Sequence, residues 1–200
     1  MNPDRPLRTL AEPAGYEEEI KKSRFVCSAA RADDVEEARL FLGSVRDPSA
    51  THNCWAYRIG ANYRFSDDGE PGGTAGQPIL RAIDGHGLDH VVVVVTRYFG
   101  GIKLGAGGLA RAYGGVAAEC LRRARLLEVR PQRRLLVEIP YAQSARLYPI
   151  LVGAGARRLG EAYAEDHLVW EIELDAARVS ELEAALRDAS KGAVRVRTLE

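Results

Sequence analysis

Alternating and helically spaced apolar residues divide the first part of the chain into short elements. The alternation in RFVCSAAR predicts a strand over residues 24–31. Val35, Ala38 and Leu42 then recur at the spacing of one helix face, and Asp33 is the expected N-terminal cap of that helix. The chain is therefore expected to begin with a strand followed by a helix.

A hairpin and two helices surround the most apolar segment. Residues 52–68 alternate between apolar or aromatic and polar side chains on both sides of residues 60–62, which is typical of a β-hairpin. The segment LDHVVVVVTRYFG has no polar face, which indicates a strand buried on both sides of a sheet. Helices are expected from about residue 76 to 83 before this strand and from residue 107 to about 127 after it.

The arginine-rich segment RRARLLEVRPQRR separates this part of the chain from a second pattern. After it, the order is strand, helix, strand, strand, helix, strand, from RLLVEIPY to AVRVRTL. Leu135, Val137 and Ile139 fall on one face of the first of these strands. We expect an α+β protein with two domains, residues 1–130 and 131–200, the second being a ferredoxin-like βαββαβ plait.

Length and composition limit the class of protein. With 200 residues, 46% of them hydrophobic, the chain can bury a substantial core. The longest apolar run, Val91 to Val95, is far shorter than the roughly 20 residues that span a membrane, and no signal-peptide pattern is found. Three widely spaced cysteines without a CxxC pair predict neither disulfides nor a zinc site. We expect a cytoplasmic protein with no membrane contact, no metal and no cofactor.

Charge and glycine distribution direct attention to the middle of the chain. Lys plus Arg and Asp plus Glu both total 28, which argues against a protein that coats nucleic acid by bulk charge but leaves room for a local basic patch. Eleven of the 20 glycines fall between Gly69 and Gly108, although a glycine in a helix or strand destabilises it. Close approach of the backbone to a ligand or to another segment explains such a cluster.

The string GGIKLGAGG leads from the buried strand into a helix. Free backbone N–H groups and the positive end of the helix dipole would meet there, beside basic side chains, and favour an anion. The string is neither a Walker loop nor a clean GxGxxG fingerprint. The alternative is that the glycines let a strand and a helix pack closely. The candidate anion-binding or nucleic-acid-binding residues are Arg97, Gly100, Gly101, Lys103, Gly105, Gly107, Gly108 and Arg111.

Three carboxylates precede PGGTAG. Asp67, Asp68 and Glu70 could hold a divalent cation or act as acid and base, and they are the candidate catalytic residues. An acidic turn before a helix N-terminus is also common without any chemistry. His52 and Cys54 share one face of a strand, but no third residue that would orient a catalytic pair is evident, which favours a buried thiol and a structural histidine.

Four strings together resemble the IMPACT family in its bacterial YigZ branch. They are KKSRF from Lys21, HNCWAY from His52, DDGEPGGTAGQPIL from Asp67 and TRYFGGIKLGAGGLARAYG from Thr96. The resemblance covers residues from about 16 to 128, and the tail is similar to the extra C-terminal domain of the YigZ branch. It implies a first domain with the left-handed βαβ fold of a small-subunit ribosomal protein and of domain IV of elongation factor G, followed by another elongation-factor-like domain.

The resemblance also implies a role in regulation. Eukaryotic relatives oppose the starvation-activated kinase of translation initiation by competing for its ribosome-bound activator. Bacteria lack that kinase pathway, so the partner here must differ.

Three functions follow as hypotheses. The first is a non-enzymatic cytoplasmic factor that binds RNA or the ribosome and regulates translation under stress. The second is a hydrolase or transferase that acts on an anionic substrate through the acidic and glycine loops. The third is a scaffold that docks a protein partner on the exposed sheet face of the second domain. The sequence carries no prediction of oligomeric state.

Overall fold

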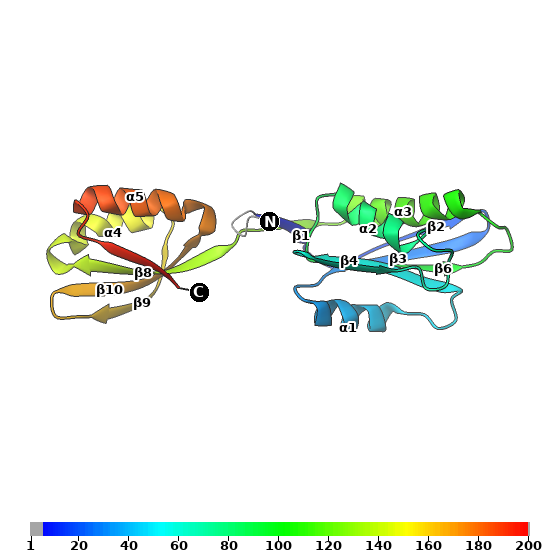
Figure 1. Ribbon diagram of the computed structural model, residues 1–200, viewed down its shortest axis with the longest axis horizontal. Coiled ribbons are helices and arrows are strands. Elements are labelled where there is room, and N and C mark those ends of the chain that lie inside the picture. Colours follow the sequence, from blue (N-terminus) through cyan, green and yellow to red (C-terminus); the bar gives the residue numbers. More distant parts are fainter. Residues whose placement is uncertain (1–5, 200) are drawn as a thin grey trace. The chain divides into compact units, whose positions relative to one another are not determined.

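The computed structural model describes residues 6–199 as a mixed α+β protein (Figure 1). The chain forms two compact units, the first from Leu7 to Val129 and the second from Arg130 onward. The predicted domains, 1–130 and 131–200, include residues 1–5 and 200, which lie outside the described part of the chain.

A five-stranded antiparallel sheet forms the centre of the first unit. Its strands are β2 (Ala14–Ile20), β3 (Ser23–Arg31), β4 (His52–Ile59), β5 (Asn62–Ser66) and β6 (Val91–Tyr98), in the order β2-β3-β6-β4-β5. Helices α2 (Gly76–Gly85) and α3 (Ala106–Arg123) cover one face, and α1 (Val35–Val45) covers the other (Figure 1). The predicted doubly buried strand is β6, the middle strand of this sheet.

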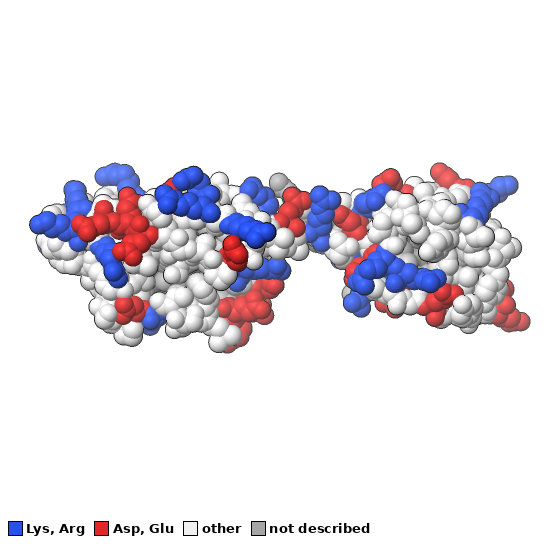
Figure 2. Space-filling view, turned by 180° about the vertical axis from the view of Figure 1, so that it is seen from behind, with Lys and Arg blue, Asp and Glu red and all other residues white. Residues whose placement is uncertain are grey.

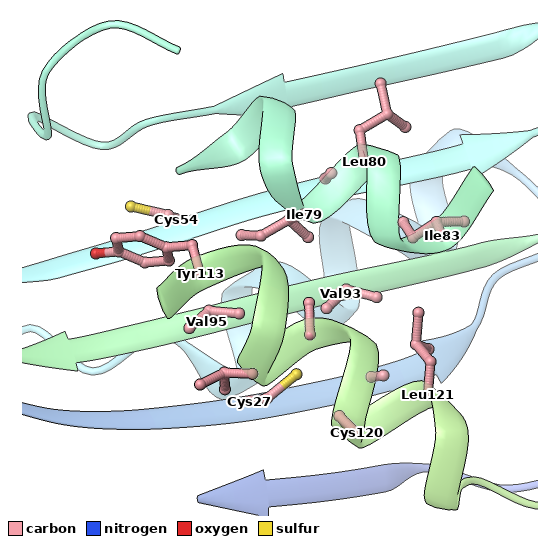
Figure 3. Packing of buried hydrophobic residues seen from close by; sticks show 14 of the residues in the cluster. Cys27, Cys54, Ile79, Leu80, Ile83, Val93, Val95, Tyr113, Cys120 and Leu121 are labelled. Atoms are coloured by element: carbon pink, nitrogen blue, oxygen red, sulfur yellow. The ribbon is translucent and has the colours of Figure 1, made fainter. Parts of the chain in front are cut away.

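The valine run of β6 faces both layers of helices. Val91, Val93 and Val95 belong to the core under α2 and α3, whereas Val92 packs with the residues under α1. Successive side chains of a strand point to opposite faces, so an unbroken apolar run suits a strand with a helix layer on each side. Figure 3 shows how Ile79, Ile83 and other side chains of α2 and α3 meet this strand.

Two boundaries differ from the prediction. The N-terminal cap of α1 is Asp34 and not Asp33: Asp34 Oδ1 accepts a hydrogen bond from Glu37 N at 2.8 Å, and the Glu37 carboxylate accepts one from Asp33 N at 2.8 Å. The cap therefore lies one residue later than expected, and the Glu37 carboxylate reaches back to the backbone of the residue before the cap. Helix α3 ends at Arg123 and not near residue 127 because β7 (Leu126–Val129) pairs with β1 (Leu7–Leu10).

An aromatic pair packs within the core of the first unit. Tyr113 is fully buried and meets Phe25 edge to face, with the ring centroids 5.2 Å apart. Cys27, Cys54 and Cys120 are all buried and free. Figure 3 shows Cys54 beside Tyr113.

The second unit is a four-stranded antiparallel sheet with two helices on one face (Figure 1). Its elements are β8 (Gln132–Pro140), the 3-10 turn η1 (Tyr141–Gln143), α4 (Ser144–Gly153), β9 (Arg157–Tyr163), β10 (His167–Asp175), the 3-10 turn η2 (Ala176–Arg178), α5 (Val179–Ser190) and β11 (Arg195–Leu199). The strand order is β11-β8-β10-β9. Leu135, Val137 and Ile139 share one face of β8, as predicted, and that face packs against the helices. Within residues 6–199, no helix is long and apolar enough to cross a membrane.

Candidate functional site

Asp67 caps the N-terminus of α2. Its carboxylate accepts hydrogen bonds from the backbone N–H groups of Gly73 at 2.8 Å, Ala75 at 2.9 Å and Gly76 at 2.8 Å. These donors have no partner inside the helix, and Ala75, the residue at the cap position, offers no side-chain acceptor. The carboxylate of Asp67 is thus engaged by the backbone of its own loop.

Asp68 ties the same loop to β4. Its side chain accepts a hydrogen bond from Asn53 N at 2.6 Å, and its backbone carbonyl accepts one from His52 Nδ1 at 2.7 Å. The Nδ1 atom of His52 therefore carries the proton. Asp68 has a φ of +42°, a left-handed conformation that a residue other than glycine adopts only where its surroundings hold it.

Glu70 is the centre of a buried polar network. The residue is 8% exposed, and its Oε1 accepts hydrogen bonds from Arg97 Nη1 at 2.6 Å and from the Tyr113 hydroxyl at 2.8 Å. His52 Nε2 lies 3.9 Å from the same oxygen. These contacts join the acidic loop, β6, α3 and β4 below the surface of the first unit.

Arg97 was predicted to bind an anion, but its guanidinium is buried and not exposed to solvent. The residue is only 5% exposed and is neutralised by Glu70. Its Nη2 donates to Ser23 Oγ at 3.4 Å, and Gly100 N donates to the same oxygen at 3.2 Å. Arg97 therefore links the acidic loop to the glycine loop, so the two loops do lie together, but the charge that joins them is buried.

Cys54 lies next to this network as a protonated thiol. Its Sγ donates to the carbonyl of Asp67 at 3.0 Å, and burial raises the pKa of the thiol to about 12. Burial likewise raises the pKa of Tyr113. Neither group is ionised near neutral pH, which leaves Cys54 without the thiolate that nucleophilic catalysis needs.

Close packing explains part of the glycine cluster. A Cβ atom on Gly100 would lie 1.7 Å from the carbonyl oxygen of Lys22, so only glycine lets the loop meet the turn between β2 and β3. Gly101 and Gly105 have φ angles of +87° and +72°, which glycine adopts without strain. Gly107 has neither constraint: it lies exposed in the first turn of α3, and its nearest neighbour is the side chain of Arg111.

The turn between β2 and β3 contains two lysines in strained conformations. Ile20 pairs with Ser23, so Lys21 and Lys22 are the only residues of the turn, and their φ angles are +49° and +64°. Such two-residue turns normally use Asn and Gly. Both lysines are exposed. They were absent from the predicted site because strand β2 was not predicted, and without it the two lysines could not be recognised as a turn.

A cavity of about 230 Å³ opens between this turn and the start of α3. Its lining is Ile20, Lys21, Leu104, Gly108, Arg111 and Ala112. The N-cap residue of α3, Gly105, makes no side-chain cap, and no acidic residue lies in the first turn. The helix end therefore keeps its positive partial charge. Lys21 and Arg111 line the cavity, while Lys22 and Lys103 belong to the adjoining turn and glycine loop; we call these four exposed residues the basic rim.

The rim is a local feature. Figure 2 shows acidic and basic side chains interspersed over the visible face of the first unit, in keeping with a net charge of zero. In the described part of the chain, no group of three or more His, Cys, Asp or Glu side chains is placed to hold a metal ion.

Comparisons with known proteins agree with this architecture. The family model of the Impact N-terminal domain matches residues 21–121. The IMPACT family member YigZ of Escherichia coli K12 is 38% identical over 197 residues, 95% of this chain and 96% of that protein. An IMPACT family member in the pol 5' region of Thermus thermophilus is 55% identical over 132 residues, 66% of this chain and 73% of that protein.

A solved structure is similar over almost the whole chain. The crystal structure of a hypothetical protein matches with a TM-score of 0.67 and 37% identity, and the match covers 98% of each chain. The family model and the YigZ relative both include the segments that build the basic rim and the buried network. The chain therefore belongs to the IMPACT family and is a YigZ-type member.

Proposed function

We propose that this protein is a non-enzymatic factor that binds RNA, including the RNA of the ribosome, through the basic rim. The observation that carries the proposal is the convergence of Lys21, Arg111 and the uncapped start of α3 on one cavity in a protein of zero net charge. Helix N-termini and clustered cations both favour phosphate. Membership of the IMPACT family supports a role in the control of translation under stress, in the cytoplasm.

The rim is suited to phosphate because its charged side chains are exposed to solvent. Lys21, Lys22, Lys103 and Arg111 are exposed, in contrast to the buried ion pair of Arg97. The turn of Lys21 and Lys22 also carries backbone strain, a feature that clusters at functional sites. Compared with the predicted anion-binding residues, the proposed phosphate contacts therefore include Lys21 and Lys22 in place of Arg97, and they keep Lys103 and Arg111.

The topology supports the fold assignments that go with this function. We infer that the second unit is a ferredoxin-like plait, because its strands lie in the order fourth, first, third, second. For the first unit, membership of the IMPACT family leads us to infer the left-handed βαβ fold of the ribosomal protein and of domain IV of elongation factor G. Both folds host many activities, so they support RNA binding only by analogy.

The acidic loop gives the hydrolase or transferase hypothesis no support. Asp67 accepts three backbone hydrogen bonds, Asp68 accepts one from Asn53, and Glu70 is buried against Arg97. A carboxylate that acts as base or metal ligand must reach the substrate or the ion. On the open sheet face of the second unit, Arg157 forms an ion pair with Glu173 at 2.6 Å.

A salt series tests the proposal. The double variant Lys103→Ala, Arg111→Ala is compared with the native protein in binding a labelled structured RNA. The matched control is Arg39→Ala, Arg81→Ala, which removes two exposed charges from α1 and α2. Native affinity should fall steeply with salt, and the rim variant should lower the slope of log K against log salt by about 0.7 to 0.9 for each phosphate that it no longer neutralises.

The control variant should bind as the native protein does. Native binding that ignores salt, or an equal loss of affinity in both variants, would contradict RNA binding through the rim. Absence of RNA binding by the native protein would shift the search to a protein partner.

A further inference from the structure

Phe99 is an exposed aromatic residue at the start of the glycine loop. It is 48% exposed, and it directly precedes Gly100, whose backbone contacts the turn of Lys21 and Lys22. Lys103 follows four positions later in the same loop. A large, half-exposed apolar side chain therefore belongs to the same loop as Lys103 of the basic rim.

The ring of Phe99 contacts Arg97, and the residue remains half exposed. The guanidinium carbon of Arg97 lies 5.4 Å from the ring centroid of Phe99 and 5.5 Å from that of Phe25. Arg97 is itself fixed by Glu70. The backbone N–H of Phe99 donates to Thr51 Oγ1 at 2.9 Å. An aromatic ring that is ordered before binding loses little conformational freedom when a ligand stacks on it.

We propose that the glycine loop takes an unpaired nucleotide, whose base stacks on Phe99 while its neighbouring phosphates lie on the basic rim. This inference rests on the proposed RNA-binding function and narrows its ligand to single-stranded RNA. Bases inside a duplex are stacked on each other and offer no free face to a protruding ring. Every base has such a face, so recognition is expected to depend little on sequence.

The experiment compares two RNAs on the full-length protein. The first is a labelled single strand of about 12 nucleotides, within the site size of single-strand binders, and the second is the duplex of the same sequence. The variants are Phe99→Ala, Phe99→Tyr, which keeps an aromatic face, and Tyr63→Ala. Tyr63 is the matched control, because it is 54% exposed and also has an arginine, Arg58, over its ring, but it lies on strand β5.

The expected result is tighter binding of the single strand by the native protein. Phe99→Ala should weaken single-strand binding by about 5-fold to 100-fold, the usual loss when a stacking aromatic is removed. Phe99→Tyr and Tyr63→Ala should bind as the native protein does. A 2-aminopurine base in the single strand should lose fluorescence on binding the native protein, a signature of stacking that does not depend on any variant folding.

The outcomes separate the two proposals. If the native protein binds neither RNA, the RNA-binding function itself fails. If Lys103→Ala, Arg111→Ala abolishes binding but Phe99→Ala leaves it unchanged, or if the duplex binds as tightly as the single strand, then only the stacking inference is overturned. Unchanged 2-aminopurine fluorescence on saturation would overturn it as well.

Discussion

At the residue scale, the buried contact of Glu70 with Arg97 and Tyr113 sets the chemistry of the first unit. Two residues predicted to serve opposite roles, a catalytic carboxylate and an anion-binding arginine, neutralise each other in the interior. A buried charge without a partner is costly, so both members of the pair are needed together. The charges left for a ligand are those of the basic rim.

Replacing Glu70 by glutamine should destabilise the protein. Glu70→Gln keeps the shape of the side chain but leaves the guanidinium of Arg97 buried without a counter-charge, which costs about 3–5 kcal/mol of unfolding free energy. Urea denaturation measures the loss. Glu119→Gln, which breaks the solvent-exposed contacts of Glu119 with Arg122 and Arg123, is the control and should have a much smaller effect. Equal effects of the two changes would show that the buried pair has no special role.

Cys54 should make stability fall at alkaline pH. Burial raises the pKa of its thiol to about 12 from an ordinary value of 9.0, so between these pH values the unfolded chain releases a proton that the folded protein retains. Unfolding is then favoured as pH rises, by up to about 1.4 kcal/mol per pH unit. Denaturation of the native protein and of Cys54→Ala between about pH 8 and pH 11, a range that spans the pKa of an unfolded thiol, checks this. The variant should show a shallower decline, and parallel curves would refute the assignment.

At the scale of elements, the β2–β3 turn and the start of α3 form the candidate site together. The turn supplies Lys21 and Lys22, the glycine loop supplies Lys103, and the first turns of α3 supply Arg111. Gly100 allows the loop and the turn to touch. Each element brings one part of the rim, and the site depends on their contact.

Replacing the two lysines of the β2–β3 turn should stabilise the protein and weaken its binding to RNA. In Lys21→Asn, Lys22→Gly, both positions receive residues that favour the left-handed conformation, so the unfolding free energy should rise by about 1 kcal/mol or more. RNA affinity should fall because the rim loses two charges. Lys191→Asn is the control: Lys191 has a φ of +53° at the end of α5, and the same relief there should leave RNA binding unchanged. A turn variant that is more stable and still binds RNA fully would remove the lysines from the site.

At the scale of the whole molecule, each unit has its own hydrophobic core. The larger core of the first unit includes Ile79, Val93 and Leu121, whereas that of the second unit includes Leu147 and Leu186. A unit with its own core can be destabilised by a substitution in that core while the other unit stays folded.

A cavity created in the core of the second unit should therefore destabilise that unit alone. Leu147 is fully buried, and Leu147→Ala should destabilise the second unit by about 2–5 kcal/mol. Native-state hydrogen exchange should report faster exchange in β8 and β10 and unchanged protection in β3 and β6. Val116→Ala, in the core of the first unit, is the reciprocal control. Loss of protection throughout the chain after either change would mean that both units unfold as one.

Much of the fold followed from patterns that are local in the sequence. The hairpin around Gly60, the doubly buried strand of Val91–Val95 and the alternation of β8 were predictable because strand periodicity depends only on neighbouring side chains. The strand β2 was missed because its charged, mostly exposed positions carry no apolar pattern. The beginning of strand β7 was predicted as the end of a helix, because the pairing of β7 with β1 joins residues more than a hundred positions apart.

The sequence by itself determined the α+β class, the family and the location of the charged and glycine-rich loops, because composition, periodicity and motifs are properties of the chain. Tertiary structure alone decided which charges remain free. Arg97 and Lys103 are basic residues close together in the sequence, yet Arg97 in β6 is buried against Glu70 while Lys103 is exposed. The side chains that meet a given charge come from distant segments, and burial determines whether that charge serves the fold or a ligand.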